Sequence, residues 1–248
     1  GKGISIITKP SQAKNVPAMM SEFKTQTGCY KETFIVSKYL DNPMLLADRK
    51  FDLRLYVCVT SFKPLKVYTY REGFCRLCFE SYSAISGKAD PNEELFAHLT
   101  NVSLQKYCSQ YNDVHGGKWP FTSFLQYVEV NYGKERMTKL VDDIDRIFIT
   151  TLKAVQPVML NDKHCFEMYG FDVLIDDCFA PWLIEVNASP SLVTTTEHDK
   201  VLKKNLMNDL INLLIPPTWV DGKRGKGSST CKEKKVGNFV LLYDEAED

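Results

Sequence analysis

The chain has 248 residues, of which 44% are hydrophobic, and its 31 lysines and arginines equal its 31 aspartates and glutamates in number. Such a chain can bury a globular core, and its zero net charge gives no global attraction to nucleic acid or membrane surfaces. The eight cysteines show no disulfide-framework spacing, which indicates a reducing, intracellular compartment. No apolar run is long enough to span a bilayer, and no signal peptide is visible. Because the chain begins at Gly1 without an initiating methionine, we expect further sequence before it.

Local sequence patterns predict an α+β fold without internal repeats. In chain order they predict a strand at residues 3–7, a short helix or loop at 11–23, strands at 33–40, 50–60 and from 67 onward, and helices at 123–130, 137–155 and 201–214. A basic segment rich in Gly and Ser, residues 222–235, predicts a mobile linker. We expect the short apolar segment 239–243 after it to dock back as a strand.

The segment around residues 170–191 predicts an antiparallel hairpin. Strands at residues 171–175 and 182–187, with a turn centred between residues 178 and 179, place Asp172 directly opposite Glu185. Asn187 lies two residues further along the second strand, and therefore on the same face.

This hairpin predicts a metal site. Two directly opposed carboxylates repel each other, so the arrangement favours a cation between them, and ligation by oxygen alone suits Mg²⁺. On the opposite face of the second strand, Ile184 and Val186 are expected to enter a core. The alternative is a solvent-facing acidic patch on an edge hairpin, which the spacing alone leaves open.

A second charged feature lies along the strand predicted at residues 50–60. Lys50, Asp52 and Arg54 share one face, and a run of apolar residues shares the other: Phe51, Leu53, Leu55, Val57 and Val59. A symmetric turn at residues 61–64 places Arg54 opposite Arg71, whereas a bulge at Gly73 brings Arg76 to the face of Arg54. Either register leaves two arginines close together, which is unfavourable unless an anion lies between them. The alternative is an ordinary solvent-facing strand.

Smaller signals favour turns and packing. The run from His98 to Asn101 is most simply a turn with a capping asparagine. Cys75 and Cys78 form a lone CxxC without further ligands, which favours packing over a zinc site. The flexible glycine loop before Lys118 presents either an anion contact or a plain turn. No Ser-His-Asp or Cys-His pattern supports covalent nucleophilic catalysis.

Several separated motifs resemble those of one enzyme family. They are RKFDLRLYV at residues 49–57, YREGFCR at 70–76, HLTN at 98–101, HGGKW at 115–119, KHCFEMYGFDVLIDD at 163–177 and PWLIEVNASPSL at 181–192. Together they closely resemble the tubulin tyrosine ligase-like family of ATP-grasp ligases, from residue 1 to about residue 214. Within that family the chain looks most like the polyglutamylase branch of types one and nine. Its end leans toward type nine, which is associated with cilia and flagella.

The resemblance implies a partial ATP-grasp fold. The end of the central subdomain would occupy residues 1–40, the C-terminal catalytic domain 41–215, and a basic flexible tail with a short docking segment 216–248. The implied reaction is ATP-dependent polyglutamylation, in which ATP phosphorylates a glutamate γ-carboxylate in a tubulin tail and free L-glutamate attacks the acyl phosphate. Implied partners are tubulin tails or microtubules and accessory subunits, without nucleic acid or membrane. The implied location is the cytoplasm and cytoskeleton, in a cilium or flagellum.

The resemblance also assigns roles to individual residues. Arg54 would stabilise the transferring phosphoryl group and the tetrahedral intermediate, while Arg76 and Lys118 would hold the incoming glutamate. Asp172, Glu185 and Asn187 fall on the family's Mg²⁺ ligands, with Glu185 placed to bridge two ions. The implied nucleotide contacts are Gly1, the hinge residues Ser37, Lys38, Tyr39 and Leu40, and Lys50, Phe51, Asp52, Thr100 and Asn101.

Some features depart from the family pattern or leave alternatives. The family's phosphate-binding lysine and N-terminal domain would precede Gly1, so we expect this chain alone to be inactive. Ser37 stands where many relatives carry glutamine. A tubulin glycylase on the same scaffold and a non-catalytic tubulin-binding protein are the alternatives. Two cations, Arg76 and Lys118, favour a diacid over glycine.

Overall fold

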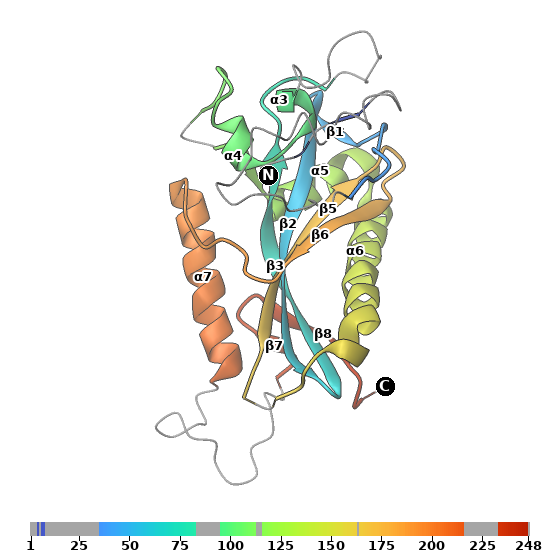
Figure 1. The fold of residues 1–248 in the computed structure, drawn as a ribbon, viewed down its shortest axis with the longest axis vertical. Helices are drawn as coiled ribbons and strands as arrows, with labels where there is room; N and C mark the ends of the chain where they lie inside the picture. Colours follow the sequence, from blue (N-terminus) through green and yellow to red (C-terminus); the bar gives the residue numbers. More distant parts are fainter. Residues whose placement is uncertain are drawn as a thin grey trace, which may run out of the picture.

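The computed structural model describes residues 4, 6–7, 35–82, 95–112, 116–162, 164–215 and 233–247. Within these residues, eight strands form one antiparallel sheet with the order β6-β5-β2-β3-β8-β7, while β1 pairs with β2 and β4 with β3 (Figure 1). The strands are β1 (Leu45–Leu46), β2 (Arg49–Phe62), β3 (Leu65–Leu77), β4 (Lys118–Pro120), β5 (Glu167–Ile175), β6 (Pro181–Asn187), β7 (Lys235–Val236) and β8 (Phe239–Asp244). This mixture of helices and one antiparallel sheet confirms the predicted α+β class.

One face of the sheet is covered by α5 (Phe121–Tyr132) and α6 (Lys134–Val155), and a short 3₁₀ turn, η2 (Gln156–Val158), follows them. Phe51, Leu53 and Val57 of β2 lie in the same core cluster as Phe124 of α5 and Phe148 of α6. The alternating apolar residues of β2 therefore face these helices, as their spacing predicts. Both helices also confirm the predictions at residues 123–130 and 137–155.

The opposite face is covered along part of its length by α7 (Glu197–Leu214). In Figure 1, α6 and α7 lie on opposite sides of the sheet. Leucines of α7 pack in a second apolar cluster with Tyr56, Cys58, Tyr68 and Tyr70 of the two central strands. The helix begins four residues before the predicted start at residue 201.

The last described segment completes the sheet. β8 pairs with β3, with Tyr68 opposite Leu241, and β7 then pairs with β8. The predicted docking strand at residues 239–243 is therefore confirmed, and it lies beside a central strand.

Other predictions meet the described residues only in part. Residues 35–40 of the strand predicted at 33–40 form no strand, and Ile35 is 94% exposed, so its apolar side chain has no sheet to pack against. The predictions at 11–23 and most of those at 3–7 and 222–235 lie outside the described residues. Two short helices, α3 (Leu95–His98) and α4 (Val102–Gln105), precede β4. No helix in the described ranges is both long enough and apolar enough to span a membrane.

Candidate functional site

Charged side chains form two rows on the face of the sheet that α7 partly covers. In the first row, Arg76 of β3 lies opposite Asp52 of β2 on one side and opposite Lys118 of β4 on the other. In the second row, Arg54 of β2 lies opposite Asp172 of β5, which lies opposite Glu185 of β6. Because Asp52 and Arg54 are two residues apart on one strand, both rows lie on the same face. The strand pairing thus assembles residues from five strands.

The pairing of Asp172 with Glu185 confirms the predicted hairpin partner. The two strands pair with different offsets on either side of this point, because Val173 lies opposite Leu183 and leaves Ile184 as an extra residue in β6. The turn is therefore centred on Cys178, half a residue earlier than predicted, and the bulge at Ile184 restores the expected partner of Asp172. Asn187 donates from Nδ2 to Oε1 of Glu185 over 3.2 Å, so the two side chains are adjacent.

The prediction that Ile184 and Val186 of β6 enter a core is wrong. Ile184 is 54% exposed and Val186 is 37% exposed, because β6 is the edge strand of the described sheet. Glu185 is exposed as well, whereas Asp172 is only 2% exposed. The opposed carboxylates thus occupy different environments, and only one belongs to a buried network.

The sequence analysis predicts that an anion lies between two neighbouring arginines, and in the structure that anion is Asp172. Arg54 donates from Nε to Asp172 Oδ1 over 2.5 Å and from Nη2 to Oδ2 over 3.1 Å, and Arg76 Nη2 lies 2.7 Å from Oδ2. Arg76 also forms a two-pronged pair with Asp52 through both of its carboxylate oxygens. Burial alone would raise the pKa of Asp172, but hydrogen bonds from Arg54 and the charge of Arg76 outweigh it and hold the pKa below its ordinary value.

The symmetric-turn register for β2 and β3 is wrong. Arg54 lies opposite Phe74, and the pairing jumps from Tyr70 to Gly73 so that two residues are left over in β3. One of them, Arg71, turns to α6 and pairs with Asp145 over 2.8 Å. Arg76 does lie on the face of Arg54, as the bulge alternative predicts. The reason differs, because the two residues left over before Gly73 preserve the alternation, and the change of face comes from the single unpaired residue Thr60 near the turn.

A glycine is needed where the bulge rejoins β2. A Cβ atom on Gly73 would lie 2.5 Å from the backbone oxygen of Arg54 and 2.9 Å from Cδ2 of Leu55, closer than atoms of a side chain can approach. The close contact between Gly73 and the backbone of Arg54 therefore helps to fix the position of this arginine.

At one end of the charged face, Lys50 contacts the segment that the resemblance assigns to adenine binding. Lys50 Nζ donates to the Tyr39 hydroxyl over 3.0 Å, and this hydroxyl lies 3.0 Å from Nδ1 of the buried His98. Burial lowers the pKa of Lys50. The polar run at residues 98–101 therefore places its histidine beside the predicted hinge, a role that the sequence did not indicate.

The other residues predicted to contact the nucleotide differ in how far they are exposed. Ser37 and Lys38 are exposed, and Leu40, Thr100 and Asn101 are half-buried. Phe51 is 1% exposed in the core under α5, so its side chain lies away from the charged face. Asn101 precedes α4 without a side-chain capping hydrogen bond, which makes the capping interpretation wrong. Gly1 lies outside the described residues.

A third group of charges, which the sequence did not reveal, lies where α7 begins. Lys118 Nζ donates to Asp199 over 2.7 Å and to the Thr195 hydroxyl over 3.0 Å, and Lys203 lies 3.0 Å from Asp199. Burial alone would raise the pKa of Asp199, but hydrogen bonds from Lys118 and Lys203 hold it below its ordinary value. Burial lowers the pKa of Lys118. Two ammonium groups thus share one buried carboxylate.

A pocket of about 200 Å³ opens beside this group. It is lined by Phe74, Lys118, Trp119, Pro120, Thr196, His198, Asp199 and Leu202. A larger, shallow hollow runs along exposed charged residues of α6 such as Lys139, on the other side of the sheet. Because that hollow contacts none of the residues in the two rows, the smaller pocket is the relevant one.

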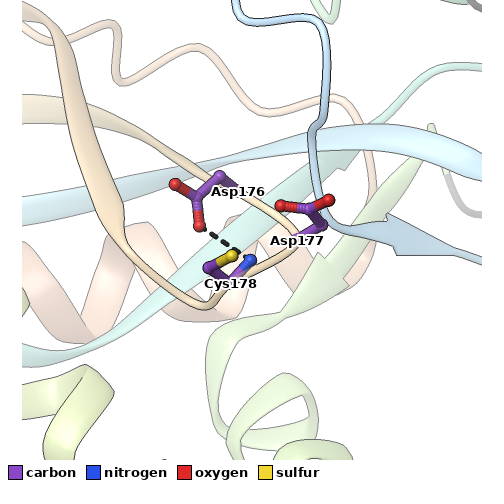
Figure 2. Close-up of side chains that lie close together, drawn as sticks. All are labelled: Asp176, Asp177 and Cys178. Carbon is purple, nitrogen blue, oxygen red and sulfur yellow. Dashed lines mark hydrogen bonds between the residues drawn. The ribbon is translucent and has the colours of Figure 1, made fainter.

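The turn between β5 and β6 holds another acidic group, shown in Figure 2. Asp176, Asp177 and Cys178 form a His/Cys/Asp/Glu group close enough to share a metal ion, within the part of the chain that the structure describes. Asp176, however, accepts from the backbone nitrogens of Cys178 and Ala180 over 2.9 and 2.8 Å. Asp177 raises the pKa of the Cys178 thiol, which disfavours the thiolate that a metal requires. These contacts describe a turn and not a metal centre.

Cys75 and Cys78 are both buried, which confirms the packing interpretation of the CxxC. Cys75 lies in the core cluster beneath α5 and α6. Burial raises the pKa of both thiols, so they remain protonated and unreactive.

Comparison with known proteins gives the relationship of the chain. A family model described as "Tubulin-tyrosine ligase family" matches residues 1–221. The chain is 46% identical over 248 residues to "Probable alpha-tubulin polyglutamylase Ttll1" of Tetrahymena thermophila, covering 100% of this chain and 59% of the relative. It is 39% identical over 214 residues to "Probable tubulin polyglutamylase TTLL9" of Bos taurus, covering 86% of this chain and 43% of the relative. It is 37% identical over 247 residues to "Probable tubulin polyglutamylase ttll-9" of Caenorhabditis elegans, covering 100% of this chain and 55% of the relative.

The chain thus spans about half the length of these curated relatives. The family match nevertheless extends through every strand of the two charged rows and through α7. The chain belongs to the tubulin-tyrosine ligase family.

Proposed function

We propose that the protein containing this chain is a tubulin polyglutamylase, an ATP-dependent ligase that joins free L-glutamate to glutamate side chains of tubulin tails. The relatives named as polyglutamylases support the substrate class. The observation that carries the chemistry is the pairing of Arg54 and Arg76 with Asp172 on one sheet face. Preorganised arginines beside carboxylates suit a reaction that brings phosphate and carboxylate groups together.

The reaction balances in two steps. The γ-phosphoryl group of ATP passes to the acceptor γ-carboxylate, which forms an acyl phosphate and ADP. The deprotonated amine of free glutamate then attacks the acyl carbon, an isopeptide bond forms, and phosphate leaves. In this proposal Arg54 stabilises negative charge in both steps. Arg76 and Lys118, opposite each other on adjacent strands, would hold the incoming amino acid and favour a dicarboxylate over glycine.

The ligand set fits Mg²⁺. The three contacts from Arg54 and Arg76 use both lone pairs of Asp172 Oδ2 but only one of Oδ1, so one acceptor position remains on Oδ1. Glu185 is exposed, and Asn187 donates from its nitrogen, which leaves its side-chain oxygen available. Asp172, Glu185 and Asn187 would hold Mg²⁺ through these oxygens, and the metal would supply neutralisation of the phosphate charge.

Nucleotide binding is proposed at the other end of the face. The chain Lys50–Tyr39–His98 would support the hinge at residues 37–40, with Asp52, Thr100 and Asn101 nearby in the sequence motifs. We also propose that the chain forms part of an ATP-grasp fold, with domain boundaries after residues 40 and 215. Microtubules and accessory subunits as partners, and a ciliary or flagellar cytoskeletal location, belong to the same proposal.

The test is Glu185→Gln in the full-length protein. Because Glu185 is exposed and lies outside the buried ion pairs, we expect unchanged stability and complete loss of glutamate incorporation into tubulin tails, measured by mass spectrometry. Glu129→Gln on α5, also exposed, is the matched control and should retain activity. Full activity of Glu185→Gln would refute the assignment. Competition between free glycine and free glutamate tests the glycylase alternative, and Mg-ATP binding tests the non-catalytic one.

A further inference from the structure

Tyr56 carries a buried hydroxyl group that the fold leaves without a hydrogen bond. The side chain is 0% exposed and packs in the apolar cluster beneath α7. Among the residues that the structure describes, its hydroxyl has no hydrogen-bond partner. Burying a hydroxyl without a partner is unfavourable, and phenylalanine would fill the same space without this cost. The hydroxyl therefore points to a ligand.

The surroundings of this hydroxyl are charged. Tyr56 follows Arg54 by two residues in a regularly paired stretch of β2, so both side chains lie on the same face. Burial raises the pKa of Tyr56 to about 12, and the charges that act on it belong to Arg54, Asp199, Arg76 and Asp172. The phenol therefore keeps its proton and lies among both charged rows and the α7 group.

The charges near the hydroxyl favour an anionic partner. Arg54 and Arg76 share Asp172, and Lys118 and Lys203 share Asp199. Among the buried and half-buried members of these groups, with Asp52 included, four cations stand against three carboxylates, which leaves one positive charge in excess; Glu185 of the second row is exposed to solvent. A protonated hydroxyl in such a field donates to an anionic oxygen.

The position of Tyr56 along β2 indicates that its anionic partner is a carboxylate of the amino acid and not a phosphate of the nucleotide. Tyr56 lies six residues beyond Lys50, about 20 Å along the strand, and so at the end away from the proposed hinge. Lys118, in contrast, lies beside the cluster that holds Tyr56, because its ammonium group is 4.8 Å from the ring centre of Phe74, a member of that cluster. The amino-acid side of the site is the nearer one.

We propose that the Tyr56 hydroxyl donates a hydrogen bond to a carboxylate of the incoming glutamate, alongside Arg76 and Lys118. This inference rests on the proposed function for the identity of the amino acid. Tyr56 would then be a further substrate-binding residue. It would take no part in phosphoryl transfer or in metal binding.

The test compares Tyr56→Phe with Tyr70→Phe in the full-length protein. Tyr70 lies directly opposite Tyr56 in the same cluster, but its hydroxyl donates to Asp209 of α7 over 3.3 Å. Tyr56→Phe should raise the KM for L-glutamate about tenfold, with kcat and the KM for ATP within about twofold and an equal or higher Tm. Tyr70→Phe should lower Tm and leave the KM for L-glutamate unchanged.

A direct titration of L-glutamate, with a non-hydrolysable ATP analogue present, separates this inference from the proposed function. Binding that Tyr56→Phe weakens about tenfold supports the inference even if the wild-type protein incorporates no glutamate into tubulin, an outcome that would refute only polyglutamylation. An unchanged affinity for glutamate, a fall in kcat alone, a raised KM for ATP, or no glutamate binding by the wild-type protein would each overturn the inference.

Discussion

The buried carboxylate of Asp172 offers the sharpest test of the ion-pair network. Asp172→Asn keeps the size of the side chain but removes the charge that Arg54 and Arg76 share. Removing one partner of a buried pair costs about 3–5 kcal/mol, because the remaining charge is left uncompensated. Arg76 retains Asp52, so the loss falls mainly on Arg54, and we expect the low end, about 3 kcal/mol.

For a domain of about 250 residues, 3 kcal/mol corresponds to a fall in Tm of about 6–12 °C. The full-length protein would be followed by thermal and urea unfolding, with Glu185→Gln as the control that removes the opposing, exposed carboxylate. Glu185→Gln should change the free energy of unfolding by less than about 0.5 kcal/mol. If Asp172→Asn is destabilised by no more than this control, the buried ion-pair network is refuted.

The same variant gives a pH signature. The pKa of Asp172 is lower in the folded protein than its unfolded value of about 3.9. Its stabilisation is therefore complete above that value and is lost as the pH falls through the lower, folded pKa. Below about pH 4, the wild-type protein should lose stability more steeply than Asp172→Asn. Parallel curves for the two proteins would contradict the ion pairing.

Two further variants test the bulge in β3. Arg71→Ala removes a partly exposed ion pair with Asp145. It should lower the free energy of unfolding, measured in urea, by about 1 kcal/mol and leave ligase activity unchanged. Loss of activity would mean that Arg71 belongs to the site. Gly73→Ala places a Cβ atom 2.5 Å from the Arg54 backbone oxygen. It should lower the free energy of unfolding by about 1–3 kcal/mol, and it should lower kcat because Arg54 is displaced. Wild-type stability and kcat would show that this close approach is unimportant.

The hairpin shows what periodicity in a sequence can reveal. Period-two alternation and a turn predict which strands pair, and the partner of Asp172 is the predicted one. The sequence does not reveal the bulge at Ile184, because a single extra residue leaves no compositional signal. It also overestimates the burial of Ile184 and Val186, since apolar character alone does not show whether a strand lies at the edge of a sheet.

The β2–β3 pair shows why charge partners are harder to predict. A symmetric turn is the simplest assumption, yet the pairing is displaced by the residues between Tyr70 and Gly73. That displacement sends Arg71 to α6 and brings Arg76 to Asp172. The need for an anion between two arginines followed from electrostatics alone. Its identity followed only from strands that are separated by about 100 residues in the sequence.

The start of α7 explains why the sequence pattern does not reveal Asp199. The apolar period of the helix begins at Leu202, so the pattern predicts a start at residue 201, whereas the helix begins one turn earlier. Thr196 caps that first turn by accepting from the backbone nitrogen of Asp199 over 3.2 Å. Polar residues are favoured in a first helical turn as caps, so their presence there gives no signal of a binding site. The carboxylate of Asp199 meanwhile lies on the buried stripe of α7 and holds Lys118. The position of Lys118 therefore depends on where α7 begins, and hence on the leucines that pack this helix against the sheet.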